Sequence, residues 1–136
     1  MVRASPARAD IRIVTSAREE ELPALMASAS VLVELADEAL TAVTPLEAMS
    51  LGLEVVAMRL PAFEEALGEH AHWVGREELE AGTRVVAGTL ARAIDSACSA
   101  ERRAARLELA AGFTWERQAR ETVAHWQTIL ARSGRA

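Results

Sequence analysis

The stretch from Thr44 to Met58 constrains the fold of this chain more than any other. It opens with Thr44-Pro45-Leu46-Glu47, which has the form of a capping box with a proline at the first helical position. Gly52 stands where a helix needs a left-handed residue at its C-terminal end. Glu54 to Met58 is then an apolar run of strand length. A short helix between a turn and a buried strand is typical of open α/β sheets, which bind ligands at such turns.

Alternating strand and helix patterns extend on both sides of this stretch. Strands are predicted at residues 11–14, 30–35, 54–58 and 71–74, with short helices between them. Helices are predicted at 84–99 and 100–111, and a last helix follows Thr114 as its N-cap residue. The chain is therefore predicted to be an α/β protein. It has a loose lead-in at 1–10 and a single domain at 11–136, with a partial Rossmann-like parallel sheet of about four strands flanked by helices and a helical C-terminal third.

The amino-acid composition limits which binding partners and which cellular compartment are expected. Hydrophobic residues make up 51% of the 136 residues, which favours a packed globule, and the net charge of −5 argues against nucleic-acid binding. Cys98 is the single cysteine, so no internal disulfide is expected and a cytoplasmic location is favoured. Cys98 follows Val86, Leu90 and Ile94 at helical spacing, which predicts an inert core thiol. No apolar run is long enough to span a bilayer, and residues 1–10 lack the apolar segment of a signal peptide.

Several segments resemble the donor-binding C-terminal domain of the retaining family 4 glycosyltransferases, which have the GT-B fold. The matching segments are Pro45-Leu46-Glu47-Ala48-Met49, Leu51-Gly52-Leu53, Val55-Val56-Ala57 and Phe113-Thr114-Trp115-Glu116. The resemblance covers roughly residues 11–130, in the family's order. It implies a nucleoside diphosphate sugar as donor substrate, with no other cofactor.

The same resemblance suggests which residues would bind the donor. The second glutamate of the family's Glu-x7-Glu pair binds the nucleotide ribose, and Glu47 aligns with it; the alternative reading is that Glu47 only closes the capping box. The first glutamate position falls on Ala39, with Glu38 one residue away. Leu40-Thr41-Ala42 replaces the family's glycine turn, so the donor-binding candidates are Glu47, Glu38, Thr41, Ala42 and Thr44.

Other parts of the family pattern are missing, and this bears on function. Compared with the family, these 136 residues are expected to correspond to the donor domain from about its third strand onward, without the N-terminal acceptor domain and without the cations directed at the pyrophosphate. Three readings remain open: a transferase component that is inactive alone, a non-catalytic protein-interaction module, or a nucleotide-binding module without transfer chemistry. No catalytic residue is assigned, and His70 and His72 lack the neighbours of a metal site.

Self-association, or a partner chain supplying the acceptor half, is expected because apolar side chains should remain uncovered. At the N-terminal side these are Ile11, Ile13 and Leu22, because the strand predicted at 11–14 would lie at the edge of the sheet with no further strand beside it. On the last helix they are Trp115, Val123 and Trp126.

Overall fold

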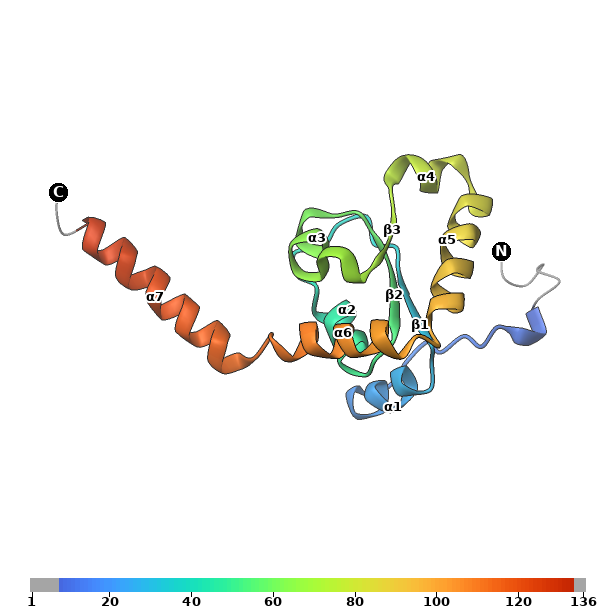
Figure 1. Cartoon of the computed structure of the whole chain (residues 1–136), viewed down its shortest axis with the longest axis horizontal. Coiled ribbons are helices and arrows are strands. Elements are labelled where there is room, and N and C mark those ends of the chain that lie inside the picture. Colours follow the sequence, from blue (N-terminus) through green and yellow to red (C-terminus); the bar gives the residue numbers. More distant parts are fainter. Residues whose placement is uncertain (1–7, 134–136) are drawn as a thin grey trace.

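The computed structural model describes residues 8–133 and shows an α/β protein built on a small parallel sheet (Figure 1). Its three strands are β1 (Val31–Glu34), β2 (Glu54–Met58) and β3 (His72–Val74), in the spatial order β1-β2-β3. Both pairings are parallel, with Val33 opposite Val56 and Ala57 opposite Trp73. The three predicted strands that contain these segments are confirmed.

The fourth predicted strand, at residues 11–14, is wrong. This segment has no regular secondary structure and follows a 3-10 helix, η2 (Arg8–Asp10), and Ile13 is 66% exposed. Strand propensity reflects packing against neighbouring strands more than an intrinsic backbone preference, and nothing among residues 8–133 pairs with this segment. The sheet therefore has three strands in the described part of the chain. The predicted lead-in at 1–10 lies mostly outside the described residues.

Helices cover both faces of the sheet. They are α1 (Leu22–Ala27), α2 (Val43–Ser50), α3 (Pro61–Leu67), α4 (Arg76–Ala81), α5 (Thr83–Ser96), α6 (Ala100–Ala111) and α7 (Trp115–Ser133), with short 3-10 turns η3 (Glu19–Glu21) and η4 (Gly68–His70). α2 and α3 lie on one face with α6 packed against α2, whereas α5 lies on the opposite face across β2 and β3.

The core consists of two layers that share β2. All five residues of β2 are buried, as expected for a parallel strand covered on both faces. Val55 and Ala57 pack with Met49 of α2 and with Phe63 and Leu67 of α3. On the other face, the buried residues Val56, Met58, Val74 and Ala93 form the second cluster.

The C-terminal end of α2 has the geometry predicted from its glycine. Gly52 has φ +85°, and its N–H donates to the Met49 carbonyl at 2.9 Å while the Leu53 N–H donates to the Ala48 carbonyl at 3.0 Å. This is a Schellman motif, which satisfies the last carbonyls of the helix. A Cβ at position 52 would also lie 2.6 Å from Nε of Arg103, so α6 approaches this turn closely.

The helical C-terminal third is confirmed, including the N-cap of its last helix. The Arg117 N–H donates to Oγ1 of Thr114 at 3.1 Å, and α7 then runs away from the rest of the molecule (Figure 1). The prediction of a core thiol is wrong, because α5 ends at Ser96 and Cys98 lies exposed in the turn beyond it. Among residues 8–133, no helix is both long enough and apolar enough to cross a membrane.

Candidate functional site

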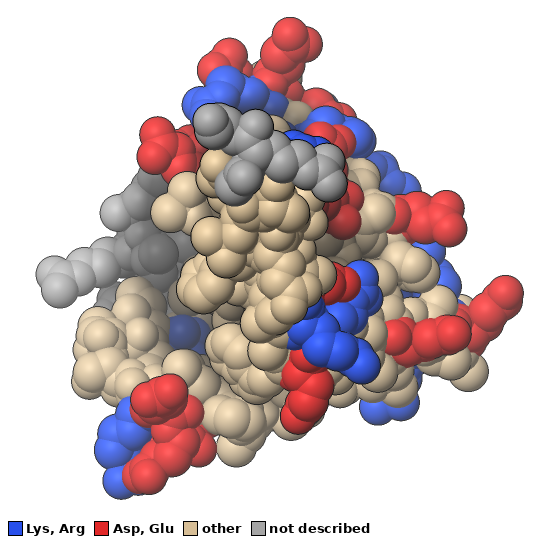
Figure 2. Space-filling model, turned by 90° about the vertical axis from the view of Figure 1, so that its left-hand side faces the viewer, with Lys and Arg blue, Asp and Glu red and all other residues tan. Residues whose placement is uncertain are grey.

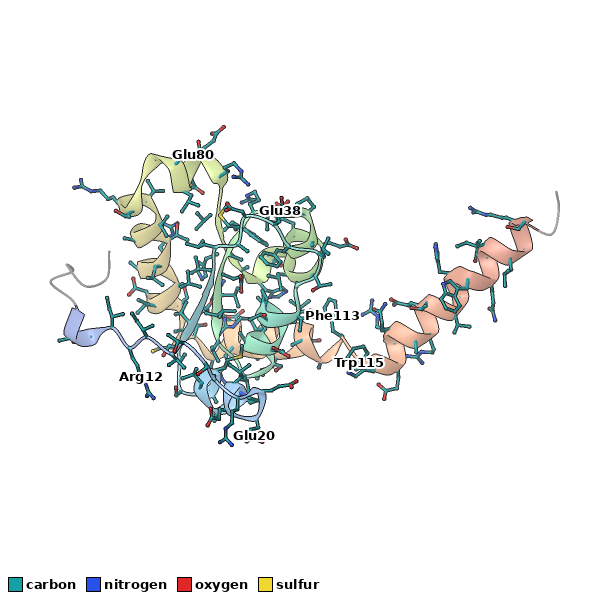
Figure 3. The ribbon with its side chains drawn as sticks, turned by 180° about the vertical axis from the view of Figure 1, so that it is seen from behind. Arg12, Glu20, Glu38, Glu80, Phe113 and Trp115 are labelled. Atoms are coloured by element: carbon teal, nitrogen blue, oxygen red, sulfur yellow. The ribbon has the colours of Figure 1, made fainter. Side chains whose placement is uncertain are left out.

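The loop between β1 and α2 holds three of the five candidate residues, and none of the three lines the groove that contains Glu47. Glu38 and Thr41 are exposed, whereas Ala42 is buried at the N-cap position of α2. Figure 3 shows Glu38 well separated from Phe113 and Trp115, which lie at the base of α7. Glu38, the glutamate nearest the position of the first family glutamate, does not line the groove that contains Glu47.

The capping box predicted at Thr44 and Glu47 is also wrong. α2 begins at Val43, with the Ala42 carbonyl accepting from the Leu46 N–H at 3.0 Å, and no side chain caps its N-terminus. Thr44 is already inside the helix, so its hydroxyl does not take the position of an N-cap acceptor. The helix starts before the proline rather than at it, because a proline is tolerated anywhere in the first turn, where its missing N–H has no intrahelical role.

Glu47 is thereby left available for other contacts. It is exposed on α2, and among residues 8–133 its carboxylate has no hydrogen-bond or ion-pair partner. Only its carbonyl oxygen receives a side-chain donor, the Ser50 hydroxyl at 2.7 Å. Of the two sequence readings of Glu47, the structural role in capping is excluded.

Glu47 lines a groove in the described part of the chain. This groove has a volume of about 410 Å³ and lies between α2 and the junction of α6 with α7. Its walls combine apolar and aromatic side chains with a few polar groups: Val43, Leu46, Glu47, Ser50, Ala110, Phe113, Thr114, Trp115, Arg117, Gln118 and Glu121. Sites for small molecules have this character, with apolar walls and few polar groups.

Arg117, which lines the groove, is held by two hydrogen bonds and an aromatic contact. Its Nε donates to Oε1 of Glu121 at 2.7 Å, and another guanidinium nitrogen donates to the Gly112 carbonyl at 3.1 Å. The guanidinium also lies over the Phe113 ring, 5.9 Å from its centroid. These contacts hold Phe113 in place without engaging Glu47, so the groove presents one unpaired carboxylate beside aromatic surface.

A second cluster of charged residues was not found from the sequence. Glu54, the first residue of β2, is fully buried, and so is Arg106 of α6, whose guanidinium donates to Oε1 of Glu54 at 2.6 Å. Arg102 forms a fork with the same carboxylate at 3.1 and 3.2 Å, and His72 Nε2 lies 3.1 Å from Oε2. Arg106 also donates to the Gly52 carbonyl at 2.9 Å. The cluster therefore ties α6 to β2, β3 and the turn after α2.

The electrostatics of this cluster favour ionised partners. Burial by itself raises the pKa of Glu54, but hydrogen bonds from Arg102 and the charges of Arg106, Arg102 and His72 outweigh it and hold the pKa below its usual value. Burial lowers the pKa of Arg106, and the nearby charge of Arg102 adds to this, while Glu54 opposes both. Nε of Arg106 is buried without a hydrogen-bond partner among the described residues.

The position of the cluster indicates a structural role. Glu54 begins its strand, so the cluster lies at the amino end of β2, while ligands of open α/β sheets bind beyond the carboxyl ends. A smaller groove of about 220 Å³ lies beside it, lined by Glu69, His70, Glu101, Arg102, Ala105 and Arg106. Its carboxylates offset its arginines, so it offers no net charge to a ligand. The sequence signal was available: a carboxylate opening a buried strand requires a buried cationic partner.

Acid should weaken the fold through this cluster. Because the pKa of Glu54 is depressed in the folded chain, its contribution to stability is complete above the ordinary pKa and is lost as pH falls through the lower, folded value. Thermal unfolding measured between about pH 5 and about pH 3 should show a steeper loss in the wild type than in Glu54→Gln, which cannot titrate. Parallel pH profiles for the two proteins would contradict this linkage.

No group of three or more His, Cys, Asp or Glu side chains within residues 8–133 is placed to hold a metal ion. The candidate site is therefore the α2–α6–α7 groove with Glu47 on its wall. Comparison of the chain with protein-family models, with curated proteins and with solved structures finds no match.

Proposed function

We propose that this chain is a glycosyltransferase-like domain that binds a nucleoside diphosphate, or its sugar, in the α2–α6–α7 groove. The observation that carries the proposal is the Glu47 carboxylate, which is exposed on the wall of that groove and is not used in capping α2. A carboxylate is an acceptor-only group, which suits the two hydroxyls of a ribose. The motif resemblance around Glu47 points to the same contact.

The remaining walls suit the rest of such a ligand. Phe113 and Trp115 offer aromatic faces on which a nucleobase can stack, an interaction that every base can make. Val43, the first residue of α2, lies at the end of the groove where backbone N–H groups and the helix dipole favour an anion. The ligand would then place its base toward α7, its ribose at Glu47 and its phosphates toward the start of α2.

The same groove argues against sugar transfer by this chain alone. Arg117 is the cation that lines it, and Glu121 and the Gly112 carbonyl already occupy its guanidinium. With Glu47 and Glu121 on the walls, the groove is net negative, so it stabilises poorly the charge that develops on a departing nucleoside diphosphate. Weak binding without turnover is the expected behaviour.

Calorimetry with UDP and GDP tests the proposal, using inorganic pyrophosphate as a control for phosphate binding alone. Glu47→Gln should weaken nucleotide affinity by about tenfold or more, the effect of losing hydrogen bonds to a charged group. Its melting temperature should stay unchanged, because Glu47 is exposed and caps nothing. Glu65→Gln, an exposed glutamate on α3, is the matched control and should leave affinity unchanged.

Two outcomes would overturn this proposal in different ways. If neither nucleotide binds at millimolar concentration, or if Glu47→Gln binds as well as wild type, the groove is not a ribose site. If the purified chain turns over a UDP- or GDP-sugar and Glu47→Ala abolishes the turnover, the domain is an autonomous transferase and the inactivity stated above is wrong.

A further inference from the structure

α7 exposes a continuous apolar face that nothing in the described part of the chain covers. Trp115 is 87% exposed, Trp126 64% and Leu130 70%, with Val123 and Ile129 about half exposed. α7 projects from the body in Figure 1, and in Figure 2, which looks along the helix from its C-terminal side, uncharged side chains form an unbroken column with the charged ones to one side. The exposure expected from the sequence for Trp115, Val123 and Trp126 is confirmed.

Such a helix depends on packing for most of its stability. α7 has 19 residues, a length of roughly 28 Å, and in proteins a helix is stabilised mainly by the packing of its apolar face rather than by helix propensity. Two exposed tryptophans and three exposed aliphatic side chains on one face are more than a soluble monomer usually leaves open. Some apolar surface must therefore cover this face when the helix is formed.

We propose that the covering surface is the same helix of a second copy of this chain, paired antiparallel about a two-fold axis that crosses the seam at the height of Ala124. The spacing of the residues along the apolar face favours a second copy of α7 as the partner. Residues 115, 119, 122, 126, 129 and 133 alternate at intervals of four and three, the spacing of a two-helix seam. The proposal needs no residue of α2, although Trp115 also lines the α2–α6–α7 groove.

The antiparallel register matches large side chains with small ones in every layer. With the axis at the height of Ala124, Trp126 of one copy lies opposite Thr122 of the other, and Ile129 lies opposite Ala119. The outermost layer places Trp115 opposite Ser133. Interdigitating large and small residues is how helix interfaces reach native packing density.

The parallel arrangement lacks this complementarity. It would set Trp126 against Trp126 and Ala119 against Ala119, which alternates crowded layers with empty ones. It would also bring both bodies together at the start of α7, whereas the antiparallel pair keeps them at opposite ends of the seam (Figure 1). A two-fold antiparallel pair is also closed, so it does not propagate into fibres.

The available area fits a dimer of modest affinity. The exposed parts of Trp115, Val123, Trp126, Ile129 and Leu130 amount to roughly 500 Å² of apolar surface in each copy. A stable interface buries about 800 Å² per partner, counting its polar rim. The apolar face of α7 therefore supplies most of the interface area that a stable dimer needs, and the polar residues beside it supply the rest.

On each side of the seam, near the two-fold axis, one residue lies opposite the same residue of the second copy. Val123 lies opposite Val123 of the second copy on one flank, and His125 lies opposite His125 on the other. Only residues next to Ala124 have this property. Ala119 of one copy is displaced from Ala119 of the other by ten residues, which is about 15 Å along the helix.

Light scattering and circular dichroism across a concentration series test association. The wild type should approach twice the monomer mass of 14.6 kDa, and its helix content should rise as the dimer forms. Trp126→Glu should raise the dissociation constant by about thirtyfold or more, as removal of a central tryptophan does. Gln127→Glu, an exposed neighbour on α7, should leave it unchanged. A wild-type monomer at high micromolar concentration, or equal effects of the two variants, would overturn the proposal.

Disulfide crosslinking in a Cys98→Ser background tests the register. Val123→Cys should form a crosslinked dimer under mild oxidation, whereas Ala119→Cys should not, because a disulfide requires Cα atoms within about 7 Å. The double variant Ala119→Cys/Ile129→Cys should crosslink again, since these positions lie opposite one another. Crosslinking of the single Ala119→Cys variant with none in Val123→Cys would overturn the antiparallel register. The melting temperature of each reduced variant confirms that its body is folded.

Discussion

Replacing Arg106 with methionine should lower the free energy of unfolding by about 3–5 kcal/mol, the cost of breaking a buried ion pair from one side. Glu54 and Arg106 are both fully buried, and the Arg106 guanidinium lies 2.6 Å from Oε1 of Glu54. Methionine fills part of the space but leaves the carboxylate to Arg102 and His72 alone. Since a domain of this size has about 5–15 kcal/mol of stability in all, denaturant unfolding should show a large decrease.

Arg103→Met is the matched control, because Arg103 is exposed on the same helix and carries the same side chain. Its effect should stay within about 0.5 kcal/mol, as at other surface positions. Removing both charges of the pair, in Glu54→Leu/Arg106→Met, should recover much of the loss, since the two apolar residues bury no charge and Arg102, which loses its partner, is partly exposed to water. Equal, small effects of Arg106→Met and Arg103→Met would show that the cluster does not hold α6 in place.

Met49→Ala should cost about 2–5 kcal/mol, the range for truncating a fully buried methionine. Met49 has no exposed surface and packs from α2 into the cluster formed by Val55, Phe63 and Leu67. The cavity would open where α2 meets the sheet, so the effect should appear as a lower denaturant midpoint at an unchanged slope.

Ser50→Ala provides the comparison for that change, because Ser50 is the next residue of α2 and is exposed. It should shift the free energy of unfolding by less than about 0.5 kcal/mol. If Met49→Ala and Ser50→Ala were equally mild, α2 would not pack on the sheet in the orientation described, and the groove that α2 borders would be in doubt.

Local signals in the sequence were sufficient for most of the fold. Gly52 could be placed as the residue after a helix because only glycine adopts φ near +85° at little cost, and β2 could be placed because four of its five residues are apolar. The strand predicted at 11–14 was wrong because a run of β-branched residues forms a strand only where a neighbouring strand pairs with it. The core position predicted for Cys98 was wrong because the helical spacing of apolar residues continues past Ser96, where α5 ends.

The candidate site was predictable only in part. Glu47 was found through its motif, but its role in a capping box depended on where α2 begins, and helix boundaries shift by one or two residues without a strong sequence signal. The groove itself joins α2 to residues 110–121, a contact between distant segments that no local pattern reports. Glu54 carried a local signal, because a carboxylate in a buried strand needs a cationic partner, but Arg106 could not be identified as that partner, since it lies 52 residues away.

Chemical-shift mapping of the uniformly ¹⁵N-labelled chain during titration with UDP and GDP tests the central claim most directly, because it locates a ligand without requiring catalysis. A nucleotide bound in the α2–α6–α7 groove should shift the amides of Val43, Glu47, Ser50, Phe113 and Gln118 most, together with the indole N–H of Trp115. The Glu47→Gln variant should show the same set of shifts only at higher nucleotide concentration. Shifts gathered instead around Glu69, His70 and Arg102, or no shifts at millimolar nucleotide, would contradict the assignment of this groove as the nucleotide site.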